Sequence, residues 1–328
     1  MVVSCPRWRP VCDRSVRDPD VIRRGSRDVE QLALARVVRG VGARMSLPRQ
    51  VLPGSFYMLC RRCTQRMFLL RPDPITNETF LYCLIEAAQR HKIEIILSVA
   101  MSNHHHTVLF DRYGTINEFT EHFHKMLAKA MNAHWGRWEN LWSSEPPCLV
   151  RLTDASDVLD KLVYAATNPV KDGLVERVHQ WPGVNGLSAL LNRRPLVARR
   201  PRQFFRAGGE MPEYVELELV IPPELGDAEE VRRQLRELVE AEEDRLAAER
   251  RKTGQRVLGR RAVLRQSWRD CPTSVEARRV LRPRVAAGNT WRRLEAHRRC
   301  KAFQSAYRAA RADWLAGRKT TFLSLIHI

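Results

Sequence analysis

The spacing of apolar residues over 51–170 changes repeatedly between the two-residue period of strands and the 3.6-residue period of helices. In order, the pattern predicts a strand within 51–70, a helix over 74–91, strands over 93–101 and 104–110, a helix over 116–135 and a strand over 148–152. A further helical pattern over 157–170 has Val158, Leu162 and Ala165 on its apolar side.

The predicted order β-α-β-β-α-β is that of the split ferredoxin-like unit. We therefore predict an α+β fold with a ferredoxin-like (RRM-like) antiparallel sheet, helices on one face, and a basic helical region at the C-terminal end. The strands on either side of Ser102-Asn103 are expected to form an antiparallel hairpin. Thr76 is expected to cap the first helix. The helix over 157–170 is expected to end before Pro169, because the residue before a proline avoids the helical region.

Three consecutive histidines begin the strand pattern at 104–110. Alternate side chains of a strand face the same way, so His104 and His106 project from one face and His105 from the other. Two imidazoles at this spacing form half of a site for a divalent metal. A surface histidine cluster is the alternative interpretation; a cloning tag is disfavoured because the run is internal and short.

Tyr164 and Asn168 are four positions apart, which places a phenol and an amide oxygen on one face of the helix over 157–170. Taken alone, Tyr164 is a half-buried packing residue and Asn168 a residue at the helix end. Taken together with His104 and His106, they predict a metal-assisted nucleophilic site.

The chain resembles the HUH nucleases, and more closely the REP-associated tyrosine transposases among the single-tyrosine HUH transposases. The resemblance covers about Pro48 to Leu190. It is carried by Asn103-His104-His105-His106, Gly136-Arg137-Trp138-Glu139-Asn140-Leu141-Trp142, Tyr164-Ala165-Ala166-Thr167-Asn168-Pro169-Val170-Lys171-Asp172-Gly173-Leu174-Val175 and Trp181-Pro182-Gly183-Val184. Two residues depart from the family pattern: His105 stands where an apolar residue is usual, and Ser102 where proline is common.

The resemblance implies that His104, His106 and Asn168 hold one Mg²⁺ or Mn²⁺ and that Tyr164 is the nucleophile. It further implies a transposase that cleaves and rejoins hairpin-flanked single-stranded DNA through a 5′-phosphotyrosine intermediate, with REP-like palindromes as substrate. Two alternatives stay open: a non-catalytic or domesticated DNA-binding regulator on the same fold, and a relaxase or replication initiator of the same chemistry. A monomer and a homodimer are both compatible with the sequence.

The formal net charge of +19 favours a polyanionic partner, with nucleic acid as the first expectation. The apolar runs are too short for a membrane span, so no membrane partner is expected. Eight scattered cysteines fit a reducing bacterial cytoplasm, where the protein is expected to associate with the nucleoid. The candidate DNA-contacting residues are Arg61, Arg62, Arg66, Trp138, Arg292 and Arg293.

Four segments are predicted along the chain: a basic disordered arm over 1–44, the HUH single-tyrosine domain over 45–190, a basic irregular linker over 191–211, and a helical accessory DNA-binding region over 212–328. Met45 is an expected translation start, so 1–44 and the last few residues are candidates for non-native sequence. The last region is expected to contain a strand within 212–223 and helices over 227–250, 257–268 and 291–315. In the last helix, a stripe of Phe303, Tyr307, Ala310 and Trp314 is expected to pack in a core. The remaining histidines considered, His122, His124 and His134, are expected at the surface or facing DNA.

Overall fold

The computed structural model describes residues 48–274 and 283–322. The predicted arm over 1–44, the expected start at Met45 and the last residues, 323–328, lie outside the described residues. The strands are β1 (Ser55–Arg62), β2 (Glu94–Ala100), β3 (His104–Asp111), β4 (Cys148–Leu152), β5 (Leu196–Arg199), β6 (Tyr214–Leu217) and β7 (Val285–Ala286). The helices are α2 (Pro74–His91), α3 (Ile116–Trp135), α4 (Ala155–Lys171), α5 (Leu187–Leu191), α6 (Ala228–Thr253), α7 (Arg260–Arg265) and α8 (Thr290–Leu315), with short 3-10 turns η1 (Thr64–Arg66), η2 (Val178–Gln180) and η3 (Pro223–Leu225).

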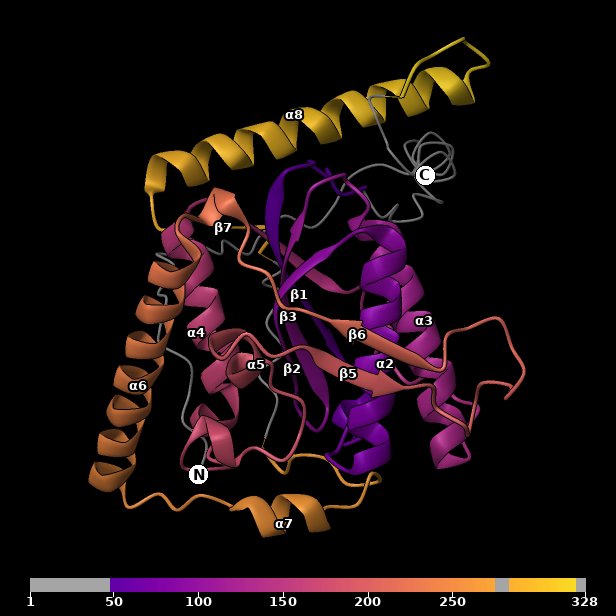
Figure 1. Cartoon of the computed structure of the whole chain (residues 1–328). Coiled ribbons are helices and arrows are strands. Elements are labelled where there is room, and N and C mark those ends of the chain that lie inside the picture. Colours follow the sequence, from indigo (N-terminus) through magenta and orange to yellow (C-terminus); the bar gives the residue numbers. More distant parts are fainter. Residues whose placement is uncertain (1–47, 275–282, 323–328) are drawn as a thin grey trace, which may run out of the picture. The chain divides into compact units, whose positions relative to one another are not determined.

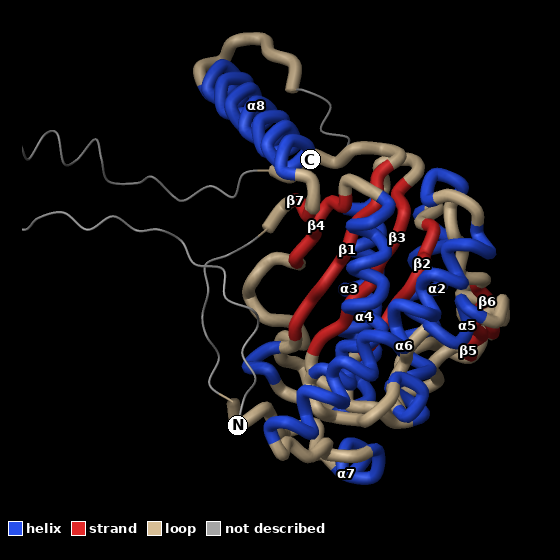
Figure 2. Tube along the Cα trace, turned by 90° about the vertical axis from the view of Figure 1, so that its left-hand side faces the viewer, coloured by secondary structure: helices blue, strands red, loops and turns tan. Residues whose placement is uncertain are grey.

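Five strands form the main sheet in the order β2-β3-β1-β4-β7, and Figure 2 shows them side by side. The four strands of the ferredoxin-like unit pair antiparallel, which confirms the predicted fold class. The predicted hairpin at Ser102-Asn103 joins β2 to β3. The short β7 adds to β4 in parallel.

Helices cover both faces of this sheet (Figure 1). The two helices of the split unit, α2 and α3, pack together on one face, as predicted. Their apolar stripes, with Phe80 on α2 and Phe119 and Phe123 on α3, are fully buried against the sheet. The extra helix, α4, lies across the other face against β2 and β3, and α6 packs on α4. This face carries the candidate site.

Two predicted helix ends are wrong. The cap of α2 is Asp73 rather than Thr76: its carboxylate accepts the Thr76 backbone N–H at 2.7 Å. Helix α4 continues through Pro169 to Lys171. A proline this close to a helix end removes only its own N–H from the ladder, and the last turn still closes through the Asp172 N–H and the Asn168 carbonyl at 3.0 Å.

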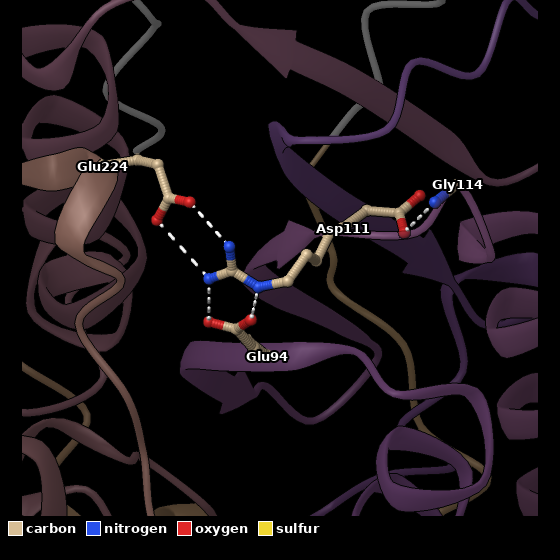
Figure 3. A network of polar contacts seen from close by, with 5 residues as sticks. Glu94, Asp111, Gly114 and Glu224 are labelled. Atoms are coloured by element: carbon tan, nitrogen blue, oxygen red, sulfur yellow. Dashed lines mark hydrogen bonds and ion pairs between the residues drawn. The ribbon is translucent and has the colours of Figure 1, made fainter.

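A polar cluster fixes the far end of β3 (Figure 3). The Asp111 side chain is fully buried and accepts the backbone N–H groups of Gly114 at 2.8 Å, Thr115 at 2.9 Å and Ile116 at 3.1 Å. These groups lead into α3, so one carboxylate supplies the partners that a helix start lacks. The half-exposed guanidinium of Arg112 joins Glu94 on β2, at 2.6 Å, to Glu224 before α6, at 2.7 Å.

The second half of the chain differs from its prediction in three places. Residues 196–199 form β5 inside the segment predicted as an irregular linker, and β5 pairs with β6 and packs on α2. Helix α7 is shorter than predicted, at six residues. On α8, Phe303 and Ala310 are buried but Trp314 is 61% exposed, so the predicted core stripe covers only part of that helix. Among the described residues, no helix is both long and apolar enough to cross a membrane.

We predict that Asp111→Ala lowers the free energy of unfolding by about 2–3 kcal/mol, because it leaves several buried backbone N–H groups without an acceptor. Urea denaturation followed by circular dichroism measures this change. Arg112→Ala, next to it and half-exposed, is the matched control and should change stability by less than about 1 kcal/mol. Equal stability losses in the two variants would contradict the assigned role of Asp111.

Candidate active site

His104 and His106 meet on the α4 face of the sheet, as their alternation on β3 predicts. Their Nε2 atoms lie 3.1 Å apart and their ring centroids 4.8 Å apart. Strand β3 pairs with β1 on one side and β2 on the other, so the backbone that carries both rings is held along its length. A rigid strand is the support that a two-imidazole site requires.

The tautomer of His104 is fixed by its neighbour Asn103. The Asn103 Nδ2 donates to the Arg66 carbonyl at 3.1 Å, which leaves Oδ1 as the acceptor 2.7 Å from the His104 Nδ1. Nδ1 therefore carries the hydrogen and Nε2 presents its lone pair to the site. The Asn103 amide is a partner of the kind that orients metal-binding histidines in other proteins.

Cys60 is the corresponding neighbour of His106, but it is compatible with either tautomer of that ring. Its Sγ lies 2.9 Å from the His106 Nδ1, and burial raises the pKa of the thiol, which keeps it neutral. A neutral thiol both donates and accepts weakly. The Sγ–H donates to Nδ1 when His106 shares its Nε2 hydrogen with His104, and Sγ accepts from Nδ1 when Nε2 presents a lone pair. The sequence pattern does not single out Cys60, because its place opposite His106 is set by the register between β1 and β3.

Both imidazoles are held in the neutral form. Burial lowers the pKa of His104 to about 4, although the facing Asn168 side chain raises it again in part. Burial lowers the pKa of His106 well below its usual value, and the nearby His104 lowers it further. The neutral ring is the form that binds a metal ion.

Asn168 lies on α4 and is only 3% exposed. Its Oδ1 is buried without a hydrogen-bond partner. An unpaired buried acceptor costs about 1–3 kcal/mol, and here it lies beside the His104 imidazole, which in turn faces His106. Two nitrogens and an amide oxygen fit a divalent cation. The described residues contain no cluster of three or more His, Cys, Asp or Glu side chains able to hold a metal, so any such site depends on this amide.

Tyr164 lies one helical turn before Asn168 and is half-buried. Its ring centroid is 5.4 Å from that of His106, in an edge-to-face arrangement. Two cations flank the ring: the Nζ of Lys171 is 4.8 Å and that of Lys161 is 5.9 Å from its centroid. The structure thus brings together the four residues predicted for the site. Lys161 and Lys171 also lie at the site and were not predicted. Helical spacing from Tyr164 is the sequence signal that finds both lysines.

The candidate DNA-contacting residues do not form one surface. Arg62 lies opposite His104 in the β1–β3 register, at the site end of the sheet. Arg61 points to the other face, where its guanidinium lies 5.2 Å from the ring centroid of Trp142. Trp138 is 90% exposed.

The other three candidate DNA-contacting residues are Arg66, Arg292 and Arg293, and the first two take part in contacts within the protein. The Arg66 backbone carbonyl holds Asn103. On α8, the Arg292 guanidinium pairs with Asp154 at the start of α4, and Arg293 follows on the same helix.

The middle histidine, His105, faces away from the site, as predicted, and is fully buried. Its Nε2 lies 2.8 Å from the Nε2 of His124 on α3, and its Nδ1 lies 3.2 Å from the Thr107 hydroxyl. His124 is 1% exposed, so its predicted surface position is wrong. A helix residue two places from another lies on a different face, and His124 lies on the face that α3 packs against the sheet, whereas His122 is half-exposed.

No protein-family model and no curated protein match the chain. Several solved structures are similar to it, of which two are described. One is a REP-associated tyrosine transposase bound to a REP hairpin, at 16% identity and a TM-score of 0.39, covering 54% of this chain and 99% of that one. The other is a putative transposase from Deinococcus radiodurans R1, at 19% identity and a TM-score of 0.26, covering 34% of this chain and 89% of that one. At these values neither likeness decides the chemistry of the site.

We predict that His124 makes the fold sensitive to acid. Burial lowers its pKa well below the usual value, whereas the unfolded chain takes up a proton near pH 6.5. Stability is therefore present above about pH 6.5 and is lost as the pH falls below it, at up to about 1.4 kcal/mol per pH unit for one such histidine.

Urea denaturation between pH 7.5 and 5 should show a flatter pH dependence for His124→Gln than for the parent chain, whatever the loss of stability at neutral pH. His297→Gln changes an exposed imidazole on α8 and should keep the parent's slope. A His124→Gln slope equal to the parent's would refute the role of that ring.

Proposed function

We propose that the chain is a single-stranded DNA transposase or endonuclease that cleaves and rejoins hairpin-flanked DNA through a covalent 5′-phosphotyrosine. One observation carries the proposal: the Tyr164 ring lies beside His106, on the same helix face as the unpaired Oδ1 of Asn168. A nucleophile, two neutral imidazoles and an unpaired amide oxygen thus share one small space. A DNA-binding regulator without catalysis has no use for this combination.

His104, His106 and Asn168 are the residues that would hold one divalent cation. Their donors are two imidazole nitrogens and one amide oxygen, a set that suits Mn²⁺ better than Mg²⁺. A cation bound there polarises the scissile phosphate and offsets the charge that develops on it. Three protein ligands leave room for substrate oxygens.

Tyr164 makes the covalent bond. Its Oη attacks phosphorus, the bond from phosphorus to the 3′ oxygen breaks, and the phenolic proton ends on that oxygen as a free 3′-OH. The bond energy stays in the phosphotyrosine, so rejoining to a new end needs no ATP. A free phenol, with a pKa of about 10, is a weak nucleophile at neutral pH. Lys161 and Lys171 place positive charge beside the ring, where a phosphodiester is attracted.

The net charge of +19 suits a DNA substrate. The sequence resemblance points to hairpins of the REP type, with a monomer or a homodimer as the active form. In a monomer, Tyr164 serves the histidines of its own chain, an arrangement that the short distance to His106 supports.

We predict that Tyr164→Phe abolishes covalent attachment to DNA and leaves DNA binding within about twofold, because the ring and its packing stay in place. Labelled single-stranded hairpin DNA is incubated with protein and Mn²⁺ and run on a denaturing gel. Tyr113→Phe, at a 55% exposed tyrosine away from the site, is the matched control and should keep the adduct. A covalent adduct in Tyr164→Phe would refute Tyr164 as the nucleophile. If the parent chain forms no adduct, the proposed cleavage is refuted and only a DNA-binding role remains.

We also predict that Cys60→Ala weakens Mn²⁺ binding by about 10- to 100-fold, the usual cost of losing a group that orients a metal ligand. Titration calorimetry in the absence of DNA measures the affinity directly. Cys60→Ser keeps a hydroxyl that donates and accepts, so it should recover most of the affinity. Cys148→Ala removes the thiol opposite Cys60 on β4 and should bind as the parent does. Equal affinity in Cys60→Ala and the parent would show that the thiol does not orient His106.

A further inference from the structure

A pocket of about 370 Å³ lies on the face of the sheet opposite the candidate active site. It is formed where the end of β1, the last turns of α3 and the loop after α3 meet. Its lining includes Arg61, Lys129, Asn132, Trp138, Trp142 and Ser143. Its volume is within the range of about 300–1,000 Å³ that is usual for sites of small ligands.

One residue of the lining, Asn132, carries an unpaired acceptor. Asn132 donates its Nδ2 to the Glu139 carbonyl at 2.7 Å, which fixes the amide and leaves Oδ1 as the free end. That Oδ1 is buried without a hydrogen-bond partner. A ligand that satisfies it has to bring an N–H or O–H donor.

A second residue of the lining, Arg61, carries an unpaired donor. The Nε of Arg61 is buried without a partner, while the guanidinium lies 5.2 Å from the Trp142 ring centroid. Trp142 is itself held by its Nε1–H, which donates to the His124 carbonyl at 2.9 Å. The Trp142 ring beneath Arg61 is therefore held in place before any ligand binds, and the Arg61 Nε–H needs an acceptor.

Trp138 supplies the third feature. It is 90% exposed, although a tryptophan is among the side chains that gain most from burial. An exposed aromatic ring at the edge of a pocket offers a flat surface for stacking.

Together these features select a class of ligand. A phosphate offers only acceptors and leaves the Asn132 Oδ1 unpaired. An aliphatic group satisfies neither polar atom. A nucleobase carries donors and acceptors on its edge and a π-face for Trp138, and the backbone attached to it is attracted by the cations of Arg61 and Lys129.

The pocket and the active site lie at the same end of the sheet. Arg61 is opposite His105, and the next residue, Arg62, is opposite His104. Consecutive residues of a strand face opposite ways, so a DNA strand that leaves Tyr164 reaches the pocket by passing round the end of β1. We propose that this pocket binds one unpaired base of the single-stranded DNA whose phosphate is cut at Tyr164, an inference that rests on the proposed function.

Fluorescence anisotropy in EDTA tests the proposal without any cleavage. The probes are a labelled single-stranded oligodeoxynucleotide, the same backbone with abasic sites in place of its bases, and the duplex. Trp138→Ala should weaken binding of the single strand by about 5- to 150-fold, the loss of one stacked base. Binding of the abasic strand, which keeps the phosphates, should not change. Trp138→Phe should recover most of the affinity, and Asn132→Leu should lose affinity for the single strand alone.

Tyr113→Ala, at a 55% exposed tyrosine just after the far end of β3, is the matched control and should bind as the parent does. Parent affinity in Trp138→Ala, or an equal loss for the single and the abasic strand, overturns the base pocket. The assay contains no metal and forms no adduct. If the parent forms no Tyr164 adduct but Trp138→Ala still weakens binding of the single strand, the proposed cleavage is refuted and the base pocket stands. If the adduct forms but Trp138→Ala binds as the parent does, the base pocket is refuted and the proposed cleavage stands.

Discussion

The alternation of side chains along β3 is the constraint on which the candidate site depends. Because β3 is paired on both sides, His104 and His106 are held toward α4 while His105 is held in the core beneath α3. A slip of one residue in the register would exchange the two sets and bury the candidate ligands. His105 opposes such a slip, since its hydrogen bond to His124 on α3 is available only on that face of the sheet. His105 thus helps to keep His104 and His106 facing α4.

The position of Tyr164 depends on contacts from distant parts of the chain. A capping box between Asp154 and Asp157 begins α4, and the Gly288 N–H donates to Asp157 at 2.7 Å. Arg292 pairs with Asp154, so the segment that leads into α8 braces the start of the helix. Along its length α4 packs against β2, β3 and α6. The C-terminal half of the chain therefore contributes to the geometry of the site, whatever its contact with DNA.

Periodicity predicted the elements of the ferredoxin-like unit, including the full extent of α2 and α3, because each buries one continuous apolar stripe. It failed where local composition competes with long-range pairing. Residues 196–199 are basic and look irregular, yet they form β5 because β6 and α2 provide its partners. In the site, alternation and helical spacing predicted His104, His106, Tyr164 and Asn168. Cys60 was missed because its role depends on the register between two strands, which a single strand's sequence does not contain.

Unpaired buried polar atoms are part of the evidence for a ligand both at the candidate active site and in the pocket. A lone unpaired polar atom is found elsewhere among the described residues, for example the Thr76 hydroxyl, and by itself indicates nothing. The Oδ1 of Asn168 is different because two neutral imidazoles and a phenol lie around it. The Oδ1 of Asn132 is different because an unpaired Arg61 donor and an exposed ring line the same pocket. In each place several neighbouring groups lack a partner, and one ligand can contact all of them at once. The stability that such groups cost is offset by binding, which is why convergence, rather than any single unpaired atom, marks a functional surface.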